Sequence, residues 1–65
     1  MIYVNGAEQP DAASVTDMLE RIGLGAQPRG VAVALDGEVL PRARWQSQAL
    51  RPGTRVEVVG AIQGG

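Results

Sequence analysis

The residues of this chain that could carry chemistry lie at its end, where Gly64 and Gly65 close on a free carboxylate. Residues 54–59 form a strand-like apolar run that leads toward these glycines with no helix between. Terminal residues fray unless something ties them down, and glycine adds backbone freedom. A chance Gly-Gly ending has a probability of about 0.5% at average glycine usage. We therefore expect the carboxylate of Gly65 to be the functional group, with an incidental ending as the alternative.

Missing residue types exclude most other chemistry. The chain has no cysteine and no histidine, so it lacks a thiolate nucleophile, a general base that titrates near neutrality and the usual zinc ligands. All of its basic residues are arginines, which excludes Schiff-base catalysis by lysine. Ser14 and Ser47 have no histidine to activate them. We expect neither self-contained catalysis nor a metal site.

The composition indicates one small soluble domain. With 65 residues, 45% apolar and 20% charged, the chain is globular but close to the lower limit for a stable core. No apolar run reaches the length of a membrane span, and the first residues do not resemble a signal peptide, so a cytoplasmic protein without a membrane partner is expected. The arginines of the second half could form a phosphate-binding patch, but with one Trp, one Tyr and no lysine we expect ordinary surface residues and no nucleic-acid partner.

The elements that would position the chain end are mostly short strands. Asn5-Gly6 and Asp36-Gly37 are the strongest short-range signals for tight hairpins. The expected strands cover residues 2–4, 7–9, 31–35, 38–40 and 54–59. Between the last two, residues 41–50 indicate a 3₁₀ turn or short helix in which Trp45 and Leu50 cover the core. The alternative for Trp45 is an anchor for a partner protein.

A single helix is expected over residues 12–22. Its apolar stripe is followed by Gly23, which suits the position just past a helix end. Ser14 is a suitable N-cap, and Asp17 three residues later approximates a capping box. The stripe has the spacing i, i+3, i+4, i+7 and consists of Val15, Met18, Leu19 and Ile22.

This order of elements predicts an α+β fold of the β-grasp, or ubiquitin-like, kind. One helix must cover one face of a mixed sheet of four to five strands in order to bury its stripe. The first and last strands would pair in parallel at the centre of the sheet, which the long connection through the helix permits. We expect a β-grasp domain over residues 1–59 and a flexible Gly-Gly tail over residues 60–65.

The chain resembles the ThiS-type sulfur carriers of thiamine biosynthesis over essentially its whole length. The likeness rests on residues 31–42, with Pro41-Arg42, then Trp45 and Leu50, residues 52–59 and the two final glycines. The first strand and the helix match in pattern more than in residues. One departure is Asp36, where the family often has Asn, and either residue suits a type I′ turn.

The resemblance implies a protein substrate, not an enzyme. A partner related to ubiquitin-activating enzymes would use Mg-ATP to adenylate the Gly65 carboxylate, and a sulfur donor would convert it to a thiocarboxylate. A thiazole synthase would then accept the sulfur. The chain itself would bind no cofactor. The tail would thread into the partner's site, and it consists of Gly60, Ala61, Ile62, Gln63, Gly64 and Gly65.

A docking surface is expected on the sheet face away from the helix, with Val59, Ala32 and Ala34 as candidates. Three alternatives to the thiamine carrier remain open at this point. The chain could serve another pathway as the small subunit of molybdopterin synthase or as a carrier for cysteine or tRNA thiolation. It could be a non-carrier ubiquitin-fold interaction module, or a modifier conjugated to other proteins.

Overall fold

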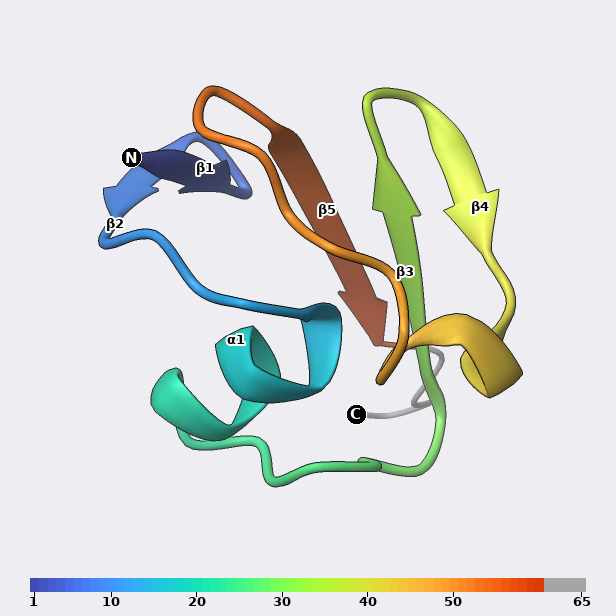
Figure 1. The fold of residues 1–65 in the computed structure, drawn as a ribbon. Helices are drawn as coiled ribbons and strands as arrows, with labels where there is room; N and C mark the ends of the chain where they lie inside the picture. Colours follow the sequence, from blue (N-terminus) through green and yellow to red (C-terminus); the bar gives the residue numbers. More distant parts are fainter. Residues whose placement is uncertain (61–65) are drawn as a thin grey trace.

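The computed structural model describes residues 1–60 of the chain and places them in one five-stranded sheet with one α-helix (Figure 1). Along the chain the elements are β1 (Ile2–Val4), β2 (Ala7–Gln9), α1 (Val15–Arg21), β3 (Val31–Leu35), β4 (Glu38–Leu40), the 3₁₀ helix η1 (Arg42–Arg44) and β5 (Arg55–Gly60). The strands lie in the order β2-β1-β5-β3-β4, so the last strand is the central one.

Both predicted hairpins are confirmed, with their strands at the predicted bounds. β1 pairs with β2 so that Val4 lies opposite Ala7, which leaves Asn5-Gly6 as a two-residue loop. The φ angles of this loop are 51° and 86°. The loop between β3 and β4, Asp36-Gly37, has φ angles of 49° and 90°. Positive φ at both loop positions is what a type I′ turn requires.

The central parallel pair of strands is also confirmed. β1 and β5 run in parallel, with Tyr3 opposite Arg55 and Val4 opposite Val56. On its other side β5 is antiparallel to β3 over five residue pairs, from the pair of Leu35 and Val56 to that of Val31 and Gly60. The sheet is therefore mixed, and it has the β-grasp arrangement expected from the sequence.

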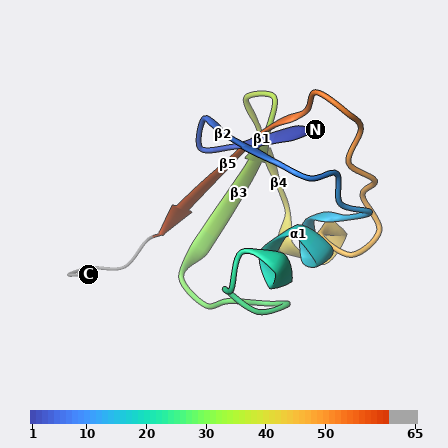
Figure 2. The ribbon, with the colours of Figure 1, turned by 90° about the vertical axis from the view of Figure 1, so that its left-hand side faces the viewer.

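One face of the sheet packs against the helix, which lies to one side of β3 and β5 in Figure 2. The fully buried side chains come from α1, from three strands and from the segment between β4 and β5. They include Ile2, Val15, Met18, Leu19, Val33, Trp45 and Val56. Side chains along β3 and β5 alternate between the two faces of the sheet, as the sequence predicted. Val33 and Val56 therefore lie in the core, and their neighbours along each strand lie on the opposite face.

Trp45 belongs to this core, so its interpretation as a partner anchor is wrong. Only 2% of its surface is exposed, and its indole Nε1 donates a hydrogen bond of 3.1 Å to the carbonyl of Leu40. The guanidinium of Arg42 lies over the ring, 4.4 Å from its centroid. Trp45 and Leu50 therefore act as covers of the core, as the sequence predicted.

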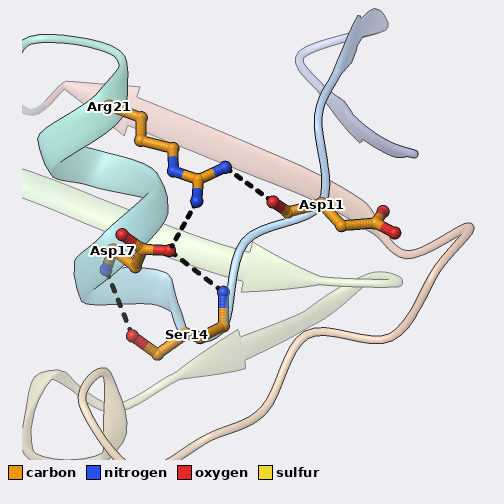
Figure 3. A network of polar contacts seen from close by, with 5 residues as sticks. Asp11, Ser14, Asp17 and Arg21 are labelled. Atoms are coloured by element: carbon orange, nitrogen blue, oxygen red, sulfur yellow. Dashed lines mark hydrogen bonds and ion pairs between the residues drawn. The ribbon is translucent and has the colours of Figure 1, made fainter.

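The helix begins at Val15, later than the predicted residue 12, because Ser14 caps it. The Ser14 hydroxyl accepts a hydrogen bond of 3.1 Å from the Asp17 amide. Asp17 reaches back one residue further than in a capping box, since its Oδ2 accepts from the amide of Ala13 at 3.1 Å. Arg21 completes the network by pairing with Asp17 (Figure 3).

The helix end has the predicted glycine. Gly23 has a φ of 91°, and its amide donates to the carbonyl of Glu20. The amide of Leu24 donates to the carbonyl of Leu19 at 2.9 Å. These two hydrogen bonds form a Schellman motif, which satisfies carbonyls that the last turn leaves free.

Replacing the cap tests the start of the helix. We expect Ser14→Ala to lower the free energy of unfolding by about 1 kcal/mol, because the Asp17 amide loses its acceptor. Ser47→Ala is a matched control, since the Ser47 hydroxyl lies on the surface and its contact with the Arg44 carbonyl is long, at 3.5 Å. Urea denaturation followed by far-UV circular dichroism measures both variants, and equal losses would contradict the role of the cap.

Candidate functional site

The predicted reactive end follows the central strand. β5 begins one residue after the predicted Thr54 and ends one residue after the predicted Val59. Gly60, which was expected to begin the tail, is the last residue of the strand and lies opposite Val31 of β3. Figure 2 shows that β5 runs away from α1 toward this end. The sheet therefore fixes the place from which residue 61 continues the chain.

The first part of β5 is held from both sides by backbone hydrogen bonds. On the β1 side, the amide of Tyr3 donates to the Thr54 carbonyl at 3.0 Å, and the amide of Asn5 donates to the Val56 carbonyl at 2.8 Å. On the β3 side, the amide of Asp36 donates to the Arg55 carbonyl at 2.8 Å. β5 is thus an interior strand with hydrogen-bonded partners on both edges, as β1 and β3 are.

Of the six predicted tail residues, only Gly60 is described. Ala61, Ile62, Gln63, Gly64 and Gly65 lie outside the described residues. The assignment of Gly65 as the reactive group, and of the others as the threaded segment, stays a prediction.

The three predicted docking residues lie together on the sheet face opposite the helix. Ala32 is paired directly with Val59 across β3 and β5. Ala34 lies two residues along β3 and therefore on the same face as Ala32. Val59 is 61% exposed, Ala32 is exposed and Ala34 is half-buried. The structure thus brings these side chains together, and their role in docking stays a prediction.

Val39 extends the same apolar surface and was missed from the sequence. It is 75% exposed and lies opposite Ala34, on β4. The position of Val39 could have been predicted from the sequence. A two-residue loop at Asp36-Gly37 pairs residue 34 with residue 39, and paired residues lie on the same face of the sheet. We call Ala32, Ala34, Val39 and Val59 the outer-face patch. A lone exposed valine needs no explanation, but neighbouring apolar side chains on one sheet face are typical of an interaction site.

Polar groups border the outer-face patch along β5. Glu57 lies between Val59 and Arg55 on the same face and is exposed, as is Arg55. Tyr3 lies opposite Arg55, and these side chains line an open groove beside β5. An apolar centre with a polar rim is the usual anatomy of a protein interface.

The described residues offer no metal site and no membrane span. Among residues 1–60, acidic side chains do not gather in groups of three or more that could hold a metal ion. In that part of the chain, no helix has the length and apolar character needed to cross a membrane.

Comparisons with known proteins agree on one family. The model of the ThiS family matches residues 1–65. The sulfur carrier protein ThiS of Thermus thermophilus is 35% identical over 66 residues, which cover 100% of each chain. The crystal structure of the thiamine biosynthesis protein ThiS from Geobacter metallireducens is similar with a TM-score of 0.78 and 34% identity, over 98% of this chain and 97% of that one. A solution structure of a thiamine biosynthesis protein from the same organism has a TM-score of 0.74 and 28% identity, over 98% of this chain and 86% of that one.

Proposed function

This chain belongs to the ThiS family of sulfur carrier proteins, and we propose that the carboxylate of Gly65 carries the sulfur for thiazole formation in thiamine biosynthesis. The observation that carries the proposal is the family match over the whole chain, which includes Gly64 and Gly65. The central position of β5 supports it, because the strand that leads toward these glycines has hydrogen-bonded partners on both edges.

The proposed chemistry converts a poor electrophile into a sulfur donor. A carboxylate oxygen of Gly65 attacks the α-phosphorus of ATP, and pyrophosphate leaves to give an acyl adenylate. Hydrosulfide supplied by the sulfur donor then attacks the carbonyl carbon, AMP leaves, and loss of the proton on sulfur gives the C-terminal thiocarboxylate. The adenylating partner binds Mg-ATP, and the metal ion neutralises charge that develops on the phosphate oxygens.

In this scheme the chain is a carrier and its partners are the catalysts. The partners are an adenylating enzyme of the ubiquitin-activating kind, a sulfur donor and a thiazole synthase that consumes the thiocarboxylate. Because the activating step consumes ATP, we place the function in the cytoplasm. Because Gly60 is paired with Val31 in the sheet, the tail beyond it has five residues, which would reach at most about 18 Å when extended. That reach is sufficient to enter a partner's nucleotide site while the sheet docks outside it.

The function is tested by the mass of the intact chain. Incubation with a cognate adenylating enzyme, Mg-ATP and a sulfur source is expected to exchange one oxygen of Gly65 for sulfur, and peptide mapping locates the exchange. Omitting ATP is the control. An unchanged mass with an enzyme that is active on another carrier would overturn the proposal.

We further propose that the outer-face patch contacts the adenylating partner. Val59 immediately precedes Gly60, so docking on this face holds the globular domain beside the point where the tail begins. Charged residues are depleted at the centre of protein interfaces, which suits a patch of alanines and valines.

A charge placed on the patch tests this contact. We expect Val59→Asp to raise the KM of the adenylating enzyme for the carrier about tenfold, because the new carboxylate must be desolvated on docking. Leu24→Asp is the matched control, since Leu24 is 44% exposed but follows α1 and is not on the patch. An equal rise in KM for both variants would show that the effect is not specific to the patch.

A further inference from the structure

Beyond the backbone hydrogen bonds from β1, two further hydrogen bonds hold β5 at Val58. Both are made by the side chain of Asn5. Its Nδ2 donates to the carbonyl of Val58 at 3.2 Å, and its Oδ1 accepts from the amide of Val58 at 2.9 Å. Asn5 is the first residue of the turn between β1 and β2, and 53 positions separate it from Val58 in the sequence. A turn residue therefore also contacts the last part of the central strand.

The Asn5 side chain continues the ladder at the point where β1 ends. The last backbone hydrogen bond between these strands runs from the Asn5 amide to the Val56 carbonyl, and the chain then turns away toward β2. The carboxamide has one donor group and one acceptor, as a peptide unit does. It occupies the place that the next residue of a longer β1 would take.

Asp36 forms the corresponding contact at the beginning of β5. It is the first residue of the turn between β3 and β4, and its φ of 49° is close to the 51° of Asn5. Its Oδ1 accepts a hydrogen bond of 2.9 Å from the amide of Arg55. The central strand is thus held at its start by one turn side chain and near its end by another.

We propose that Asn5 is a positioning residue for the carrier reaction, because it holds Val58 in the sheet two residues before Gly60. This inference rests on the proposed function of Gly65. With Val58 held, the chain leaves the sheet at a fixed place, and the Val59 side chain stays on the outer-face patch. Without the two hydrogen bonds, the end of β5 is held only by its pairing with β3, and it separates from the sheet in part of the molecules. Only the molecules in which β5 stays in the sheet would be ready to dock. The apparent affinity for the partner is the intrinsic affinity multiplied by the fraction of such molecules.

The test compares Asn5→Gly with Asp36→Gly in the full-length chain. Both native residues have positive φ, and glycine adopts that conformation without strain, so both turns are kept. We expect amide hydrogen exchange at Val58 to become about tenfold faster in Asn5→Gly and to stay unchanged in Asp36→Gly.

The kinetic readout is ATP–pyrophosphate exchange by the adenylating enzyme. For Asn5→Gly the KM for the carrier is expected to rise about fivefold while kcat is unchanged, because a docked tail reacts normally. Asp36→Gly should lower the melting temperature but leave KM within about twofold.

Three results would overturn the inference in distinguishable ways. An unchanged KM for Asn5→Gly, with the wild-type chain activated normally, removes the positioning role alone. Equal rises in KM for both variants assign the effect to general stability. If the wild-type chain supports no exchange at all, the proposed function fails and the positioning role fails with it.

Discussion

Removing Gly64 and Gly65 is expected to abolish thiocarboxylate formation while the free energy of unfolding changes by no more than about 0.5 kcal/mol. The shortened chain still ends in a carboxylate, now on Gln63, but that group lies up to about 7 Å short of the reacting position. A misplacement of about 1 Å can cost a reaction about a hundredfold. The stability is expected to persist because the buried core lies between Ile2 and Val56. Intact-mass spectrometry and urea denaturation measure the two effects.

The same truncated chain provides its own control for docking. It keeps the outer-face patch, so we expect it to inhibit activation of the full-length carrier competitively. Sulfur transfer to Gln63 at the wild-type rate would contradict the assignment of Gly65. If the truncated chain supported thiazole formation in a cell, the chain would act as a non-carrier interaction module.

The family comparisons bear on the alternatives that the sequence left open. The resemblance to ThiS-type carriers is confirmed by the family match over residues 1–65 and by the 35% identical carrier from Thermus thermophilus. The similar solved structures are thiamine biosynthesis proteins as well. These findings favour the thiamine carrier over a molybdopterin synthase subunit or a protein modifier.

Turn chemistry explains why the fold could be predicted so closely. Asn5-Gly6 and Asp36-Gly37 each place two residues at positive φ, a conformation that Asn, Asp and Gly tolerate better than other residues. Such a loop fixes the register of both its strands, so β1 to β4 have their predicted bounds. The helix start was expected at residue 12, although Ser14 was a suitable N-cap, because the alanines before Ser14 suit a helix as well as a loop. The hydrogen bond from the Asp17 amide to the Ser14 hydroxyl sets the boundary at Val15.

The site could be predicted only where it follows from local alternation. Period-2 alternation placed Ala32, Ala34 and Val59 on one face, and extending it through the hairpin would have added Val39. The contact of Asn5 with Val58 could not be found in this way. The turn alone accounts for an Asn at position 5. Nothing in the sequence marks its second contact, because Val58 lies 53 positions further along the chain.

The second large effect is expected at Trp45, whose replacement by alanine should remove a large part of the stability of the domain. Replacing a buried Trp by Ala costs about 3–5 kcal/mol. A domain of this size has a total stability of only about 3–10 kcal/mol. Trp45→Ala also removes the donor to the Leu40 carbonyl. Far-UV circular dichroism during thermal and urea denaturation measures the loss.

Two milder variants separate the contributions to this loss. Trp45→Phe keeps an aromatic ring but not the Nε1 donor, and we expect it to cost less than Trp45→Ala. Arg42→Ala removes the cation over the ring, which at an exposed site contributes about 0.5–1 kcal/mol. If Trp45→Ala were as stable as Arg42→Ala, the assignment of Trp45 to the core would be wrong.

Recovery of activity distinguishes a loss of folding at Trp45 from a loss of docking. Since Trp45 is 2% exposed, its replacement acts on activation only through the fraction of folded molecules. Osmolytes such as trimethylamine oxide favour the compact state, so they should restore activation of Trp45→Ala. They should not restore Val59→Asp, whose fold is intact and whose docking surface is changed. If osmolytes restored both variants, Val59 would also act through stability, and the outer-face patch would lose its proposed role.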